Sequence, residues 1–151
     1  MAVYSKVIFV CRDNVCQSPM AAAILNSIKR DEWLDSESRG LVVLFPEPYS
    51  TKAYSLLSNN GIRMESGTSC QLEEKDFADD TIILTMTKEE KQKIIDEYAN
   101  AKNIYTIMEF AGGSGDIMDP YGGDAEIYMM FYTSISTWVK QVENRLHEIN
   151  A

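Results

Sequence analysis

The sequence is poor in cysteine and histidine, the residues from which disulfide frameworks and zinc sites are built. Its 151 residues include three cysteines, Cys11, Cys16 and Cys70, and one histidine, His147. These cysteines are too few and too scattered for the disulfide framework of a small secreted protein, and their spacing does not fit a structural zinc site. We therefore expect no metal, and the sequence implies no cofactor.

Long apolar runs and an N-terminal leader pattern are also missing. No stretch approaches the roughly 18 apolar residues of a membrane-spanning helix. The opening residues, MAVYSKVIFV, lack a basic segment and a small-residue cleavage site, and they lead directly into a strand pattern. These features predict a cytoplasmic protein that has no membrane partner.

Positive charge is in the minority. The chain carries 14 lysines and arginines against 23 aspartates and glutamates, a net charge of -9. Surfaces that bind nucleic acids are usually basic, so we expect no nucleic-acid partner. The field of the whole chain repels anions, and an anionic ligand must therefore be attracted locally.

The composition and the pattern of apolar residues predict a single α/β domain over residues 1–151. Hydrophobic residues make up 45% and charged residues 25%, as in ordinary globular proteins. Short β-rich runs alternate with helical patterns, which is typical of a parallel sheet covered by helices. Strands are predicted at 6–11, 41–45, 82–86 and 104–107, and helices from 18 onward and at 51–59, 88–98 and 124–149.

The residues from Cys11 to Ser18 connect the first predicted strand to the first predicted helix, with Ser18 as the N-cap. Ligands bind at this edge of open α/β sheets, and backbone N–H groups together with a helix N-terminus attract anions there. A cysteine in this place is expected to have a lowered pKa and to be a thiolate near neutral pH. Asn14 and Ser18 offer side chains that hold the loop or bind the thiolate. The alternative is that Cys11 is a small buried residue that ends a strand.

A second segment whose residues are suited to catalysis is Asp119-Pro120-Tyr121-Gly122-Gly123. A carboxylic acid on a loop shaped by proline and glycine suits a general acid held against a leaving oxygen. The alternative is an ordinary Asp-Pro turn.

Together the two segments resemble the low-molecular-weight protein tyrosine phosphatases. VIFVCRDNVCQSPMAAAIL resembles that family's strand, C-x5-R-S-P loop and helix, and Asp119-Pro120-Tyr121-Gly122 resembles its late acid loop. The order of motifs is specific, because other cysteine phosphatases place the acid before the cysteine. The resemblance implies a three-layer sandwich in which a four-stranded parallel sheet is flanked by helices.

The same resemblance implies hydrolysis of a phosphomonoester in two steps through a phosphocysteine. Cys11 would be the nucleophile, Asp119 the acid and then the base, and Tyr121 one wall of the substrate cleft. A phosphotyrosine protein or a small aryl phosphate is the implied substrate. Cys16 matches a second loop cysteine, which could pair with Cys11 under oxidation. The implied phosphate-binding loop consists of Arg12, Asp13, Asn14, Val15, Cys16, Gln17 and Ser18.

The sequence departs from the family pattern at positions that are expected to bind the phosphate or to support catalysis. Gln17 stands where the family has arginine, and glutamine provides neither the charge nor the planar fork that binds two phosphoryl oxygens. Asp13 stands where glycine is usual and adds a negative charge. The histidine common near residues 66–67 is missing, and Thr87 replaces an aspartate. Arg12 is either a displaced cation or a solvent-facing loop residue.

The sequence leaves three functions open. The first is a weak phosphatase, and the second is a catalytically dead pseudophosphatase that binds a partner or an anion. The third is a phosphocysteine carrier of the sugar-transport IIB type, whose related loop has no arginine. An arsenate reductase would need a downstream pair of cysteines, which Cys70 alone does not provide. Activity, substrate, partner and oligomeric state are not determined by the sequence.

Overall fold

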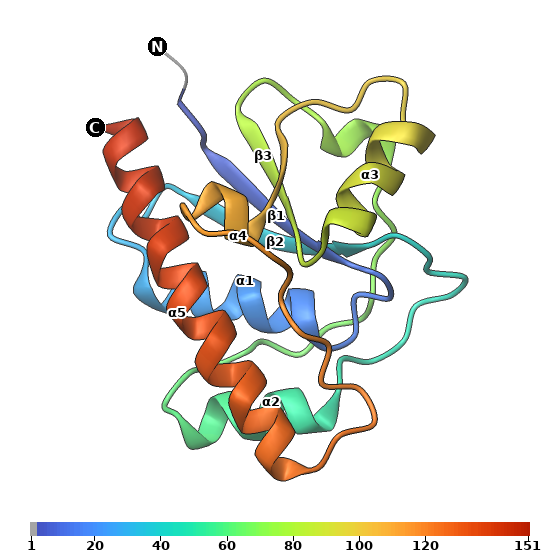
Figure 1. Cartoon of the computed structure of the whole chain (residues 1–151), viewed down its shortest axis with the longest axis vertical. Helices are drawn as coiled ribbons and strands as arrows, with labels where there is room; N and C mark the ends of the chain where they lie inside the picture. The colour runs from blue at the N-terminus through green and yellow to red at the C-terminus, as the bar shows by residue number, and fades with distance from the viewer. Residues whose placement is uncertain (1–2) are drawn as a thin grey trace.

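The computed structural model describes residues 3–151, and its strands form a four-stranded parallel sheet (Figure 1). The strands are β1 (Lys6–Cys11), β2 (Asp35–Gly40), β3 (Thr81–Thr85) and β4 (Ile104–Thr106), in the order β2-β1-β3-β4. The two central strands, β1 and β3, are apolar because helices cover both faces of the sheet. The predicted α/β fold with a four-stranded parallel sheet is confirmed.

Helices lie on both faces of the sheet and complete three layers. α1 (Gln17–Ile28) and α5 (Ala125–Asn150) pack on one face, and α3 (Lys88–Glu97) packs on the other (Figure 1). The shorter helices are α2 (Thr51–Asn59), the 3-10 helix η1 (Glu74–Asp76) and α4 (Ile107–Phe110). Within residues 3–151, no helix combines the length and apolarity needed to cross a membrane.

The side chains of β1 alternate between the two faces and set the position of the cysteine. Val7, Phe9 and Cys11 join the larger core, which α1 and α5 cover. Ile8 and Val10 join the smaller core on the α3 face. Cys11 therefore lies at the carboxyl end of a central strand and faces the layer of α1.

The second strand is polar, which explains why the sequence pattern did not identify it. β2 is an edge strand, paired with β1 alone among the named strands. Side chains cover part of its main chain: Asn26 Nδ2 donates to Ser36 O at 3.2 Å, and Arg39 Nη1 donates to Ser38 O at 2.8 Å. An edge strand does not need the apolar run that marks a buried strand.

The strand predicted at residues 41–45 is wrong, because this apolar run follows β2 and leaves the sheet. Leu41 is buried, but Leu44 is 88% exposed and Phe45 is 64% exposed. An apolar run of this length satisfies the pattern of a buried strand whether or not a partner strand exists. Here the run forms part of the wall of a cleft.

Candidate active site

The connection from β1 to α1 forms a tight loop, the cysteine loop (residues 11–18), around Cys11 Sγ. Cys11 is 1% exposed. Its Sγ lies 3.0 Å from Ser18 Oγ and accepts the backbone N–H of Asn14 at 3.3 Å. α1 begins at Gln17 with Cys16 as its N-cap, so the N-cap predicted at Ser18 is wrong. The Ser18 hydroxyl is bound to the thiol and to the Asn14 amide instead.

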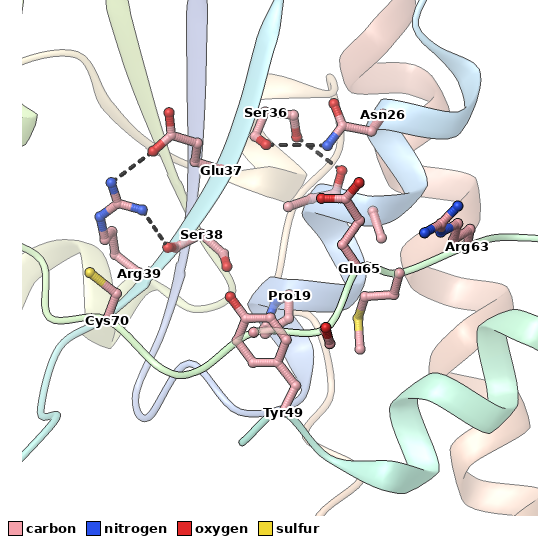
Figure 2. Close-up of a pocket in the computed structure, with 15 residues that line it drawn as sticks. Pro19, Asn26, Ser36, Glu37, Ser38, Arg39, Tyr49, Arg63, Glu65 and Cys70 are labelled. Atoms are coloured by element: carbon pink, nitrogen blue, oxygen red, sulfur yellow. Dashed lines mark hydrogen bonds and ion pairs between the residues drawn. The ribbon is translucent and has the colours of Figure 1, made fainter. Parts of the chain in front are cut away.

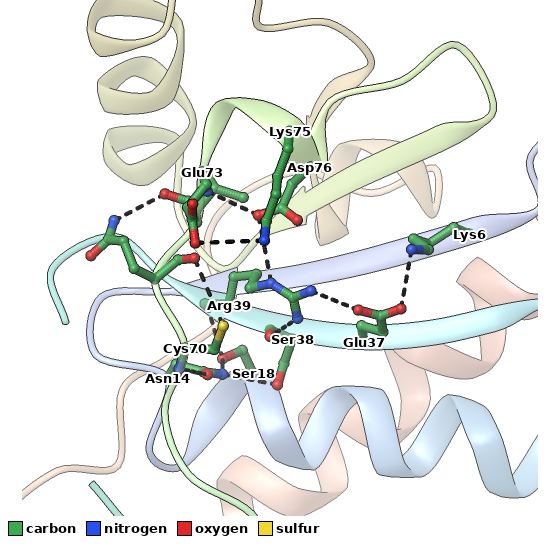
Figure 3. A network of polar contacts seen from close by, with 12 residues as sticks. Lys6, Asn14, Ser18, Glu37, Ser38, Arg39, Cys70, Glu73, Lys75 and Asp76 are labelled. Carbon is green, nitrogen blue, oxygen red and sulfur yellow. Dashed lines mark hydrogen bonds and ion pairs between the residues drawn. The ribbon is translucent and has the colours of Figure 1, made fainter. Parts of the chain in front are cut away.

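Asn14 is the centre of the polar contacts that hold the cysteine loop (Figure 3). It is fully buried and has a left-handed backbone with φ of 58°, which asparagine tolerates better than most residues. Its Nδ2 donates to Ser18 Oγ at 2.8 Å and to Ser38 Oγ at 2.9 Å, and its Oδ1 accepts the Cys70 N–H at 2.8 Å. Asn14 and Ser18 are therefore hydrogen-bonded to each other within the loop, and their role in stabilising a thiolate stays a prediction. The contacts with Ser38 and Cys70 were missed, because no local pattern links residues so far apart.

The pKa of the nucleophile candidate differs from the prediction. Burial raises the pKa of Cys11 to about 11, and the nearby Asp13 carboxylate acts in the same direction. Hydrogen bonds from Ser18 and Asn14 oppose this rise without cancelling it. The shift is opposite to the predicted lowering, because the apolar core surrounds the thiol and Gln17 brings no positive charge to the loop.

Asp13 turns its carboxylate back onto the cysteine loop. Its Oδ1 accepts the Val15 N–H at 3.1 Å and lies 3.9 Å from Cys11 Sγ. Backbone N–H groups of this kind are the donors that an anion-binding loop offers to its ligand. The side chain thus occupies one such donor and places a negative charge beside the thiol.

Gln17 is 9% exposed and reaches a segment at the other end of the chain. Its Nε2 donates to Met118 O at 3.1 Å across 101 residues of sequence. Met118 precedes Asp119, so this contact brings the two predicted motifs together. The amide is directed toward the segment of Asp119.

The segment that carries Asp119, named the acid loop (residues 116–123), begins beside the carboxyl end of β3. Ile117 N–H donates to Met86 O at 2.9 Å. At the same end of β3, Glu90 Oε1 accepts Met86 N–H at 3.0 Å and Thr87 N–H at 3.1 Å. Burial raises the pKa of Glu90 to about 7, and the negative charge of Asp119 adds to the rise.

The tip of the acid loop is exposed. Asp119 Oδ1 accepts the Tyr121 N–H at 3.0 Å, and the Tyr121 side chain is 89% exposed. Gly122 follows with φ of 80°, a conformation that favours glycine. This is the Asp-Pro turn considered from the sequence, and it holds the carboxylate at the rim of a cleft.

That cleft lies outside the carboxyl ends of β1 and β3, where the chain order of the strands reverses and where ligands bind in such sheets. The predicted site residues that line it are Arg12, Asp13, Val15, Cys16, Gln17, Asp119 and Tyr121. Cys11, Asn14 and Ser18 are buried. Walls that the sequence analysis missed come from Val42, Val43, Leu44, Phe45, Glu47, Ser50, Thr51, Lys52 and Tyr128. The exposed apolar run after β2 was the available signal.

The three cysteines are free thiols. Burial raises the pKa of Cys16 to about 12, and Cys11 and Asp119 add to the rise. A disulfide between Cys11 and Cys16 stays a prediction for oxidising conditions. In the described part of the chain, no group of three or more His, Cys, Asp or Glu residues is arranged to hold a metal ion.

A second cavity lies beside β2 (Figure 2). Asn26, Arg39, Tyr49, Arg63 and Glu65 are among the residues around it. No residue of the cysteine loop or of the acid loop lines this cavity, whereas residues of both loops line the cleft. The cleft is therefore the candidate active site.

Comparisons with known proteins show which family and which solved structures this chain resembles. The model of the family "Low molecular weight phosphotyrosine protein phosphatase" matches residues 6–150. The protein-tyrosine-phosphatase PtpB of Staphylococcus haemolyticus is 32% identical over 130 residues, which cover 86% of this chain and 91% of the relative. The arginine phosphatase YwlE of Geobacillus stearothermophilus superposes with a TM-score of 0.85 at 32% identity, covering 95% of this chain and 93% of the other. A YwlE variant with a phosphorylated active-site serine gives a TM-score of 0.84 at 30% identity, covering 94% and 95% of the two chains.

Proposed function

The chain belongs to the low-molecular-weight phosphotyrosine protein phosphatase family, and on this premise we propose that it hydrolyses phosphomonoesters slowly through a phosphocysteine on Cys11. One observation carries the proposal. Cys11 lies at the end of β1, held by Ser18 and Asn14, while the Asp119 segment is hydrogen-bonded to the same loop through Gln17. The loop that holds the nucleophile and the segment that holds the carboxylic acid thus line one cleft.

The reaction has two steps. In the first, Cys11 Sγ forms a bond to phosphorus, the phosphorus–oxygen ester bond breaks, and Asp119 gives its proton to the leaving oxygen. In the second, Asp119 takes a proton from a water molecule whose oxygen attacks phosphorus. The phosphorus–sulfur bond then breaks, and phosphate leaves with the cysteine restored. The Cys11 thiol has to pass its proton to water or to a phosphoryl oxygen of the substrate before or during the first attack, and its raised pKa slows this transfer.

Two side chains account for the low rate. Gln17 carries no charge and gives its amide N–H to Met118 O, so no cationic fork faces the phosphoryl oxygens. Loss of one well-placed transition-state donor costs about 10²–10³ in rate, and a bidentate charged clamp is worth at least as much. A carboxylate about 6 Å from a bound phosphate, at an effective dielectric of about 20, opposes binding by roughly 3 kcal/mol. Asp13 is exposed, which reduces this cost.

An aryl phosphate, such as phosphotyrosine in a protein, fits the cleft best. Leu44, Phe45 and Tyr121 are exposed apolar side chains among its lining residues. Aromatic groups bury large areas against such side chains. Phosphoarginine, a phosphoramidate and not a phosphomonoester, is the alternative substrate suggested by the arginine phosphatases among the relatives.

A pseudophosphatase is the second candidate. The bond from Val15 N–H to Asp13 and the bond from Gln17 to Met118 favour it, because both engage groups that a phosphate ligand would need. In this case the fold serves to bind a partner or another anion.

Hydrolysis of p-nitrophenyl phosphate by the wild type, Cys11→Ser and Gln17→Arg separates the candidates. Weak wild-type turnover that disappears in Cys11→Ser, with a gain of about 10²-fold in Gln17→Arg, is the expected result. No wild-type turnover, followed by activity in Gln17→Arg, would indicate the pseudophosphatase. A long-lived phosphorylated Cys11, seen by mass spectrometry after exposure to the substrate, would instead indicate a carrier.

A further inference from the structure

The amide of Gln17 joins the two halves of the candidate active site. Among the hydrogen bonds of residues 3–151, the bond from Gln17 Nε2 to Met118 O is the one that connects the cysteine loop directly to the acid loop. Gln17 is 9% exposed, so its amide is largely removed from water. A buried amide without a partner is costly, and the bond to Met118 O therefore fixes the side chain in this direction.

The other anchors of the acid loop lie at its base, away from the cysteine loop. Ile117 N–H donates to Met86 O at 2.9 Å, and Asp116 Oδ1 accepts Lys88 N–H at 3.0 Å. Both bonds hold the loop to the region between β3 and α3. Among the hydrogen bonds of residues 3–151, the Asp119 side chain takes part in one within the turn, where its Oδ1 accepts the N–H of Tyr121. Because Met118 O belongs to the peptide unit that leads into Asp119, Gln17 fixes that unit relative to the cysteine loop.

We propose that Gln17 is a positioning residue for Asp119, which it holds at the cleft by binding Met118 O. This inference rests on the proposed function, since it assigns Asp119 the role of general acid. In this chain the side chain at the arginine position then serves acid catalysis, and it no longer serves phosphate binding. A carboxylic acid must stay within hydrogen-bond reach of the leaving oxygen to protonate it.

The dependence of the rate on the leaving group tests this role. Phenyl phosphate needs a proton on its leaving oxygen more than p-nitrophenyl phosphate does, because nitrophenolate is the better leaving group. Gln17→Met keeps the shape of the side chain without the amide donor. We expect kcat for phenyl phosphate to fall about tenfold further than kcat for p-nitrophenyl phosphate, as for a partly lost general acid. In an Asp119→Asn background, the same substitution should leave the ratio of the two rates unchanged.

Asn26→Leu is the matched control, because its amide also donates to a main-chain oxygen, Ser36 O, outside the cleft. It should leave the ratio of the two rates unchanged. If Gln17→Met slows both substrates equally, or changes the ratio as strongly without Asp119, the inference is overturned. A wild type that shows no Cys11-dependent turnover contradicts the proposed function separately. In that case, amide hydrogen exchange tests whether the bond from Gln17 to Met118 O holds the acid loop. Faster exchange at residues 117–121 in Gln17→Met supports this positioning role, and unchanged exchange overturns it.

Discussion

The buried half of the cysteine loop and the half that faces the cleft differ in how closely they suit a bound phosphate. In the buried half, Cys11, Asn14 and Ser18 form a connected set of hydrogen bonds. In the cleft-facing half, Asp13 and Gln17 engage groups of the protein itself. The scaffold for the thiol and the clamp for the phosphate are therefore separable, because the core holds the first and only a ligand requires the second.

The largest expected effect is the pH dependence of the rate at which Cys11, in the buried half, is alkylated. Since burial raises the pKa of this thiol to about 11, the reactive thiolate is a small fraction at neutral pH and grows until the pH reaches that value. The rate of modification by iodoacetamide should rise about a thousandfold between pH 7 and pH 10. Mass spectrometry of the Cys11 peptide measures it, with exposed Cys70 as the internal reference. A rate that levels off below pH 8 would mean that the loop stabilises a thiolate after all.

Removal of the Asn14 side chain should break the buried half. Asn14→Ala leaves Ser18 Oγ, Ser38 Oγ and the Cys70 N–H without their shared partner. We expect the free energy of unfolding in urea to fall by about 2–4 kcal/mol, the scale for unsatisfied buried polar groups.

Asn100→Ala is the control for this experiment. Its amide donates to Glu74 O at 2.9 Å on the exposed surface. The free energy of unfolding should change by less than about 0.5 kcal/mol. Equal losses in the two variants would remove the distinction between the buried half of the loop and an ordinary surface contact.

Neutralising Asp13 should make the cleft-facing half more like a phosphate site. Asp13→Asn keeps an oxygen that can accept the Val15 N–H and removes the charge beside Cys11 Sγ. The dissociation constant for inorganic phosphate, measured by calorimetry, should fall about tenfold, because an exposed carboxylate retains part of its Coulomb repulsion. Glu47→Gln removes another charge from the lining of the cleft and should change the constant less. An unchanged constant in Asp13→Asn would show that the carboxylate does not face the bound anion.

The ion pairs of Glu37, outside the cysteine loop, should give the smallest effect (Figure 3). Hydrogen bonds with Asp35, then Arg39 and Lys6, lower the pKa of Glu37 from 4.5 to about 2. The stabilisation is therefore fully present above pH 4.5 and is lost as the pH falls toward 2. At pH 7, Glu37→Gln should reduce the free energy of unfolding by less than about 1 kcal/mol, because these partly exposed ion pairs are screened by solvent.

Urea unfolding of Glu37→Gln and the wild type at several pH values checks this. The difference between the two proteins should shrink as the pH falls toward 2. Alkylation of Cys11 should proceed at the wild-type rate in the variant. A change in that rate would show that the edge of β2 and the cysteine loop are coupled more tightly than the comparison assumes.

Some of the site was predictable because its residues are close in sequence. The run at 6–11 followed by Asn14 and Ser18 indicates a strand, a loop and a helix within one segment, and the structure has all three. The capping box of Thr87 and Glu90 at the start of α3 is another local pattern, formed by residues three apart in the sequence. The strand predicted at 41–45 is absent, because its residues match the pattern of a buried strand but have no partner strand to pair with.

The sequence alone determined the parallel α/β pattern, the cysteine at the end of β1 and the departures at Asp13 and Gln17. The tertiary structure decided the contacts of those residues. It directed Gln17 to Met118 O, placed Asp13 on the Val15 N–H and raised the pKa of Cys11. Local patterns reflect backbone preferences and the spacing of apolar residues. The direction of a polar side chain and the solvation of a thiol depend instead on groups that only folding brings together.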